Sequence, residues 1–184
     1  MNAPLVILDR DGVLNRDLPQ SVTRLEDFEI LDGAPAAVAA LTRAGYRVAI
    51  ATNQACVGRG ELAAATLREI HRRLRTAVVE AGGRIDAIYV CPEAAGDAND
   101  RRKPGAGMLR EALADFGADA PDVWFVGDSR SDLEAAGAIG CRAALVRTGK
   151  GAEVLAQGLP AKAGAVALFD KLADFAQHVA GERD

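Results

Sequence analysis

The sequence has few aromatic residues and cysteines, and it lacks a long apolar run. Aromatic residues make up 4% of its 184 residues, and the three cysteines form no Cys-x-x-Cys pair. No apolar stretch approaches the roughly 18 residues of a membrane-spanning helix, so we expect none. An odd number of cysteines, without a basic and apolar leader at the N-terminus, favours reduced thiols. We therefore expect a cytoplasmic protein.

Clusters of one charge sign are also missing. The formal net charge is −4, and no block rich in lysine and arginine occurs. This argues against binding to nucleic acid or to a membrane surface. The length suits one domain with a buried core, so we expect a single domain over residues 1–184.

Short apolar runs alternate with segments of helical pattern along the chain. We expect strands at 4–8, 46–51, 84–91, 123–126 and 142–146, and helices at 34–44, 62–81, 106–116, 131–139 and 166–179. This alternation predicts an α/β fold with a doubly wound, mostly parallel sheet that is covered on both faces. Ligands of such folds bind beyond the carboxyl ends of the strands.

Two carboxylates, Asp9 and Asp11, follow the first expected strand. In an extended segment, residues i and i+2 share a face, so both side chains are expected to face one pocket. Carboxylates that are close together repel each other, and a divalent cation would neutralise them. An acidic turn that ends at Gly12 is the purely structural alternative.

Further polar residues stand at later strand ends or just before a helix. Thr52 follows the second strand, Lys103 precedes a helix, and Asp128 and Asp132 follow the fourth strand. Each has an ordinary structural explanation, such as a turn, a solvated lysine or a helix-capping acid. Their order along the chain, however, predicts a phosphate site with a nucleophile, donors, a cation and a metal cage.

These residues resemble the haloacid dehalogenase superfamily of phosphatases in all four of its motifs. The motifs are LDRDG at 8–12, Thr52, Lys103 and GDSRSD at 127–132. Within that superfamily, LDRDGVLN, ATNQ, RKP and VRTGKG resemble the D-glycero-D-manno-heptose 1,7-bisphosphate 7-phosphatases. Histidinol-phosphate phosphatases share several of these strings, so a phosphatase for histidinol phosphate or another small phosphate monoester remains the nearest alternative. The heptose resemblance implies a role in nucleotide-activated heptose and lipopolysaccharide biosynthesis.

The resemblance implies a two-step phosphoryl transfer with a small sugar phosphate as substrate. Asp9 would attack phosphorus, and Asp11 would act as general acid and then as general base. Mg²⁺ would be held by the Asp9 carboxylate, the Asp11 backbone carbonyl and Asp128. Thr52 and Lys103 would bind the phosphoryl oxygens. The resemblance also implies a superfamily-type domain without a separate cap, and we expect a monomer.

Residues beside the motifs are candidates for contacting the sugar or a second phosphate. Asn53 and Arg102 each adjoin a motif residue, and Arg59 lies in a glycine-bearing loop at 54–60. A guanidinium binds phosphate in a bidentate manner. We expect His71, in a charged helical run, to be solvated. Direct contact of Asp132 with the metal is left open.

The sequence departs from its relatives in the segment where they carry a zinc loop. The relatives have a Cys-x-His pair and a later Cys-x-Cys pair, whereas this chain reads Cys91-Pro92-Glu93 and Asn99-Asp100-Arg101. One thiolate is too few for a four-coordinate nitrogen and sulfur site. We therefore predict no structural zinc.

A phospho-receiver domain is a remote alternative from another functional class. Receivers also combine a phosphorylated aspartate with a threonine and a lysine in a doubly wound fold. They carry that aspartate at the third strand, whereas the third expected strand of this chain ends in Cys91-Pro92. The pattern thus favours an enzyme.

Overall fold

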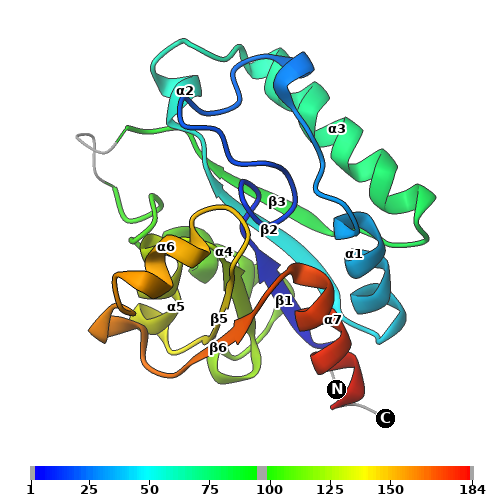
Figure 1. Ribbon diagram of the computed structural model, residues 1–184, viewed down its shortest axis with the longest axis vertical. Coiled ribbons are helices and arrows are strands. Elements are labelled where there is room, and N and C mark those ends of the chain that lie inside the picture. Colours follow the sequence, from blue (N-terminus) through cyan, green and yellow to red (C-terminus); the bar gives the residue numbers. More distant parts are fainter. Residues whose placement is uncertain (1–2, 95–98, 183–184) are drawn as a thin grey trace.

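A parallel sheet of six strands forms the centre of the molecule (Figure 1). The computed structural model describes residues 3–94 and 99–182. The strand order is β3-β2-β1-β4-β5-β6, and every neighbouring pair is parallel. The strands are β1 (Leu5–Leu8), β2 (Arg47–Asn53), β3 (Ala87–Cys91), β4 (Trp124–Gly127), β5 (Arg142–Val146) and β6 (Val166–Phe169).

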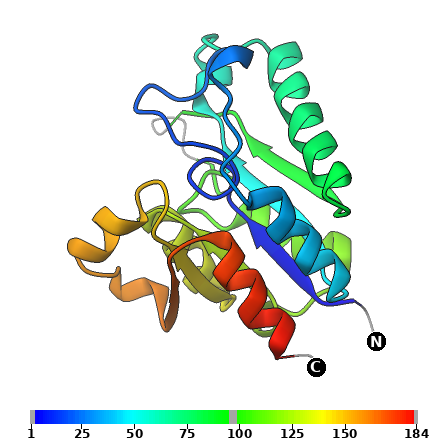
Figure 2. The same cartoon turned by 45° about the vertical axis from the view of Figure 1, so that its right-hand side comes forward.

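Helices cover both faces of the sheet, as Figures 1 and 2 show. The α-helices are α1 (Ala34–Arg43), α2 (Ala55–Gly58), α3 (Ala64–Glu80), α4 (Gly107–Phe116), α5 (Arg130–Ile139), α6 (Gly151–Ala156) and α7 (Leu172–Gly181). Single 3₁₀ turns lie at Leu25–Asp27, Ala120–Asp122 and Ala161–Ala163. Helices α1, α3 and α7 pack on one face, and α4 and α5 pack on the other.

Strand β1 shows why the sheet needs two helical layers. Val6 and Leu8 belong to the core beneath α1, α3 and α7, whereas Leu5 and Ile7 belong to the core beneath α4 and α5. All four are at most 1% exposed. A strand with two buried faces is apolar throughout, which explains the continuous run LVIL.

The predicted elements are found with small shifts at their ends, apart from three segments. The expected helix at 166–179 is wrong, because Val166–Phe169 pairs with β5 as an edge strand and α7 begins only at Leu172. Pairing with a neighbouring strand overrode the local helical pattern there. A short helix at Ala55–Gly58 forms within the expected loop at 54–60, and the short helix Gly151–Ala156 was not predicted.

The order of the strands brings the acidic residues to one edge of the sheet. Strand β4 pairs directly with β1, with Leu8 opposite Val126, and Asp9 N donates to Val126 O at 2.8 Å. The segments after both strands therefore begin side by side. Among the described helices, none has the length and apolar character required to cross a membrane.

Candidate active site

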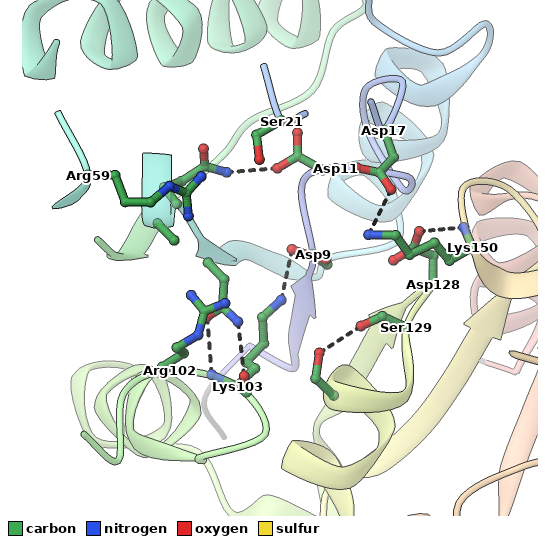
Figure 3. A pocket seen from close by; sticks show the side chains of 14 residues that line it. Asp9, Asp11, Asp17, Ser21, Arg59, Arg102, Lys103, Asp128, Ser129 and Lys150 are labelled. Carbon is green, nitrogen blue, oxygen red and sulfur yellow. Dashed lines mark hydrogen bonds and ion pairs between the residues drawn. The ribbon is translucent and has the colours of Figure 1, made fainter. Parts of the chain in front are cut away.

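A cavity of about 260 Å³ lies at the carboxyl edge of the strands (Figure 3). It includes the candidate site residues named from the sequence except Thr52 and Asp132, which do not line it. Its lining residues come from the ends of β1, β2 and β4 and from the surrounding loops: Asp9, Asp11, Asp17, Ser21, Asn53, Gln54, Ala55, Arg59, Arg102, Lys103, Asp128, Ser129, Ser131 and Lys150.

The floor of the cavity consists of the buried residues Asp9, Lys103 and Asp128, together with Asp132, which contacts Lys103 but does not line the cavity. Lys103 contacts two of the three acids. Its ammonium group lies 2.8 Å from Asp9 Oδ1 and 2.6 Å from Asp132 Oδ1. It also lies 5.4 Å from the centre of the Phe125 ring. Lys103 is only 4% exposed, so its charge is compensated by two buried carboxylates and an aromatic face.

The buried acids of the floor have perturbed proton affinities. Burial raises the pKa of Asp9 well above its ordinary value, and the charge of Asp132 adds to the rise, while Lys103 opposes it. Burial and Asp132 likewise raise the pKa of Asp128 to about 7. Burial alone would lower the pKa of Lys103, but Asp132 and Asp9 raise it above its ordinary value. The ionised forms of Asp9 and Asp128 are therefore disfavoured unless a further cation binds beside them.

Two glycines make room for the Asp128 carboxylate. A Cβ atom at Gly12 or at Gly149 would collide with Asp128 Oδ2. Both glycines have positive φ angles, 83° for Gly12 and 58° for Gly149, which residues with a Cβ atom rarely adopt. The same carboxylate oxygen accepts a 2.8 Å hydrogen bond from Lys150 N. The glycines in LDRDG and in VRTGKG thus allow the backbone to approach Asp128 closely.

A cluster of three carboxylates could hold a metal ion. Ligand oxygens of Asp9, Asp128 and Asp132 lie within 4.8 Å of one another, and all three residues are buried. Oxygen donors with an excess of negative charge suit Mg²⁺. Asp132 also binds Lys103 through Oδ1 and accepts from Ser129 N and Ser129 Oγ through Oδ2, at 3.0 and 2.6 Å. The structural alternative for Asp132, an acid at the start of a helix, is therefore present in α5, and its contact with a metal stays open.

The Asp11 carboxylate lies apart from this cluster and points toward other partners (Figure 3). Arg10 Nη2 donates to both of its oxygens at 3.0 Å. Asn15 Nδ2 donates to Oδ1 at 2.9 Å, and Gln54 Nε2 donates to Oδ2 at 2.7 Å. Burial alone would raise the pKa of Asp11, but the charge of Arg10 and these donors lower it.

Two predicted substrate ligands, Thr52 and Asn53, have hydrogen-bond partners within the protein. The Thr52 hydroxyl is fully buried and accepts from Gln54 Nε2 at 2.9 Å. Asn53 holds the backbone of Lys103, donating to its carbonyl at 3.0 Å and accepting from its N–H at 3.1 Å. Asn53 therefore fixes the segment that delivers Lys103, a role its sequence position did not reveal.

Two arginines lie at the rim of the cavity. Arg102 donates from Nη1 to the carbonyl of Glu93 at 2.9 Å. Arg59 is paired with Glu61 at 2.7 Å, and both side chains are 45% exposed. Both arginines line the cavity, and their binding of an anionic substrate stays a prediction.

Side chains fix the segment that precedes Lys103. Arg101 pairs with Glu111 at 2.6 Å and donates to Val90 O at 3.0 Å. The Asn99 side chain accepts from Arg101 N at 2.9 Å. Earlier in the segment, the Cys91 thiol donates to Glu93 Oε2 at 3.0 Å. Residues 95–98 lie outside the described residues, and the absence of structural zinc stays a prediction.

Several residues of the site were missed by the sequence analysis. Gln54 links Asp11 to Thr52, and its position directly after Asn53 was the available signal. Lys150 pairs with Asp17 at 3.0 Å, which joins the VRTGKG loop to the segment after β1. The expectation that His71 is solvated is wrong, because this side chain is half-buried and its Nε2 lies 3.3 Å from Arg10 Nη1.

Comparisons with known proteins identify the family of this chain. A family described as HAD-hydrolase-like matches residues 100–175. D-glycero-beta-D-manno-heptose-1,7-bisphosphate 7-phosphatases are similar in sequence. The one from Pseudomonas putida is 43% identical over 95% of this chain and 98% of its own length. The one from Neisseria meningitidis is 42% identical over 97% and 95%.

Solved structures show the same relationship. The D,D-heptose 1,7-bisphosphate phosphatase of B. bronchiseptica, complexed with magnesium and phosphate, superposes with a TM-score of 0.92. It is 40% identical and covers 97% of this chain and 99% of its own. The enzyme from Burkholderia thailandensis has a TM-score of 0.74 at 38% identity, over 96% and 97% of the two chains. The chain thus belongs to the heptose-1,7-bisphosphate 7-phosphatase family of HAD-like phosphatases, which are phosphoric monoester hydrolases.

Proposed function

We propose that this chain removes the 7-phosphate of D-glycero-D-manno-heptose 1,7-bisphosphate with Asp9 as the nucleophile. The observation that carries the proposal is the buried pairing of Asp9 with Lys103, at 2.8 Å, beside Asp128 and Asp132. The arrangement combines a nucleophile with the positive charge and oxygen ligands that phosphoryl transfer needs. The names of the similar proteins support the choice of sugar.

Asp9 is suited to in-line attack because its other contacts use one oxygen. Lys103 and Arg10 N both bind Oδ1, the latter at 2.7 Å. We assign Oδ2 as the attacking oxygen, which forms an aspartyl-phosphate as the sugar oxygen leaves. Lys103 then lies where it neutralises charge on the phosphoryl group.

Asp11 is the proposed general acid and base. Its side chain is 22% exposed, so one part of the carboxyl group faces the cavity. It gives a proton to the leaving sugar oxygen and later takes one from the water that hydrolyses the aspartyl-phosphate. Its lowered pKa favours the ionised form, which the second step requires. For the first step Asp11 must take a proton from solvent, and the negative charge of a bound phosphate favours that protonated form.

Asp9, Asp128 and the Asp11 backbone carbonyl are the proposed ligands of Mg²⁺. When bound there, the ion supplies positive charge that stabilises the phosphoryl oxygens in the transition state. The relative that was crystallised with magnesium and phosphate supports this choice of ion. The buried carboxylates fit it, because a cation would offset the burial and mutual repulsion that raise the pKa values of Asp9 and Asp128.

The rim supplies the proposed contacts to the rest of the substrate. Arg102, Arg59 and Asn53 would bind the sugar or its 1-phosphate, whereas Thr52, in β2, would bind the phosphoryl oxygens. We further propose a single-domain, monomeric enzyme in the cytoplasm that serves nucleotide-activated heptose biosynthesis. A single continuous sheet and an open cavity support the single-domain part.

A substrate panel tests the proposal. Phosphate release is measured with Mg²⁺ for heptose 1,7-bisphosphate, histidinol phosphate, glucose 6-phosphate and p-nitrophenyl phosphate, with Asp9→Asn as the inactive control. We expect the highest kcat/KM for heptose bisphosphate, with loss of the 7-phosphate alone. A preference for histidinol phosphate would reassign the substrate, and substantial turnover by Asp9→Asn would refute the nucleophile.

A further inference from the structure

Arg10 lies between the two motif aspartates and has no role in the mechanism above. Its side chain is fully buried, at 0% exposure. A buried guanidinium is costly unless charge and hydrogen bonds compensate it, so its surroundings indicate what it does. The Asp11 carboxylate and His71 contact it, and the Phe28 ring centre lies 6.0 Å from its Cζ.

The contacts of the Asp11 carboxylate fix its orientation as well as compensating its charge. Arg10 Nη2 donates to both oxygens of the carboxylate at 3.0 Å. Gln54 holds Oδ2 at 2.7 Å and Asn15 holds Oδ1 at 2.9 Å. A carboxylate held by three donor groups cannot rotate freely, so these contacts determine which part of it faces the cavity.

His71 supports Arg10 from helix α3. An arginine only donates hydrogen bonds, so His71 Nε2 must accept from Arg10 Nη1, and the ring is neutral with its proton on Nδ1. Burial and the nearby charge of Arg10 lower the pKa of His71 to about 4, which agrees with a neutral ring. His71 is 61 residues away in sequence, so it ties the loop after β1 to a different layer of the fold.

We propose that Arg10 is a positioning residue that aims the Asp11 carboxylate at the leaving oxygen, and that His71 positions Arg10. The inference rests on the acid–base role proposed for Asp11. It assigns a function to Arg10, the arginine of LDRDG, and to His71, which lies outside every sequence motif but contacts Arg10.

The leaving group separates this role from a merely structural one. A sugar alkoxide needs a proton as it departs, whereas p-nitrophenolate departs without one. The kcat/KM value covers the reaction up to the departure of the leaving group, so the later hydrolysis step does not contribute to it. Misdirection of Asp11 should therefore lower kcat/KM for sugar phosphates selectively, while general damage to the site lowers both.

The experiment compares kcat/KM for the best sugar phosphate of the panel and for p-nitrophenyl phosphate. His71→Leu removes the acceptor, and His71→Gln retains one. Because general acids contribute about 10²–10⁴-fold, we expect His71→Leu to lose about tenfold on the sugar phosphate and less than about twofold on p-nitrophenyl phosphate. His71→Gln should recover most of the loss, and Arg10→Met should lose more than His71→Leu.

Matched controls keep the test decisive. Arg72→Leu alters the neighbouring exposed residue of α3, which pairs with Glu69, and should change neither substrate. Arg10→Met risks misfolding because the side chain is buried, so the half-buried His71 variants carry the test in that case. Equal losses on both substrates, or full activity of folded His71→Leu, would overturn the inference.

Asp11→Asn distinguishes this inference from the proposed function. If Asp11→Asn shows the selective loss on sugar phosphate and the Arg10 and His71 variants do not, only the positioning inference fails. If Asp11→Asn itself shows no dependence on the leaving group, the acid–base role fails and the inference fails with it.

Discussion

The floor and the rim of the cavity differ in how their side chains are held. On the floor, Asp9, Lys103, Asp128 and Asp132 are each at most 8% exposed and are fixed by ion pairs and backbone donors. At the rim, Arg59 is 45% exposed and its ion-pair partner is a neighbour in sequence. Asp9 and Asp128 directly follow β1 and β4, and Asn53 holds the backbone of Lys103. The rim arginines, Arg59 and Arg102, lie outside the regular helices and strands.

This difference separates chemistry from specificity. Groups that must meet a phosphorus atom need fixed positions, and buried contacts at strand ends supply them. Groups that choose among sugars act through loops, which tolerate change more readily. Substitutions on the floor should therefore affect kcat for every phosphate ester, whereas substitutions at the rim should affect KM for particular ones.

Asp9→Asn should have the largest effect of the substitutions considered. The amide matches the carboxylate in shape but is a poor nucleophile, so kcat should fall by at least about 10³-fold for all esters. Thermal unfolding should show a fold as stable as the wild type, because the substitution removes one of several crowded charges. Turnover that remains near the wild-type rate would place the nucleophile elsewhere.

Lys103→Met should follow, with kcat reduced by about 10²–10³-fold, as for other donors that stabilise transition-state charge. The loss should be similar for sugar phosphates and for p-nitrophenyl phosphate, because Lys103 belongs to the floor. Steady-state kinetics on both esters check this. A loss confined to one substrate would contradict the division between floor and rim.

The effect of Mg²⁺ on stability should depend on pH. The pKa values of Asp9 and Asp128 are raised in the folded chain. Without metal, these two carboxyl groups therefore lose their protons at a lower pH in the unfolded chain than in the folded chain. The free energy of unfolding contributed by these groups is then present below about pH 4 and is lost toward pH 7. Mg²⁺ binds the ionised carboxylates and reverses this loss.

Thermal unfolding with and without Mg²⁺ at pH 5 and pH 8 measures the effect. At 100 times the dissociation constant, a ligand stabilises by about 2.7 kcal/mol, which raises the melting temperature of a chain of this size by roughly 5–10 °C. We expect that rise at pH 8 and a smaller one at pH 5. Asp128→Asn should reduce the rise at pH 8, and an equal rise at both values would contradict the assignment of the ligands.

Arg102→Ala should have a smaller and more selective effect. We expect KM for heptose bisphosphate to rise about tenfold with kcat nearly unchanged, because one charged contact to the bound substrate is lost. The KM for p-nitrophenyl phosphate should stay within about twofold. Arg59→Ala is the matched rim control, with the smallest expected change. A fall in kcat for every ester would show that Arg102 takes part in the chemistry common to all esters and does not act only in substrate binding.

The sequence was informative where a side chain acts close to its place in the chain. Asp9, Asp128 and Lys103 follow or precede regular elements, and the alternating pattern predicted that parallel strands would bring them to one edge. The same logic failed for Val166–Phe169, whose short apolar run has no local feature that separates an edge strand from a helix.

The sequence pattern did not predict contacts between segments that are distant along the chain. The helical pattern around His71 predicts a charged surface, and only the packing of α3 beside the loop after β1 makes it a partner of Arg10. Asn53 resembled a substrate ligand by its position, but its two hydrogen bonds to the Lys103 backbone span 50 residues. Such pairings form only when distant segments pack together, and residue type and local spacing do not identify them.

Chemical trapping of the phosphorylated residue tests the role of Asp9 most directly. In Asp11→Asn, loss of the general base should slow hydrolysis, so the intermediate should accumulate with p-nitrophenyl phosphate and Mg²⁺. Borohydride reduction of the acyl phosphate, followed by peptide mass spectrometry, should find homoserine at position 9. Asp9→Asn should yield none. Homoserine at another aspartate, or none at any position while a burst of p-nitrophenolate is observed, would contradict nucleophilic catalysis by Asp9.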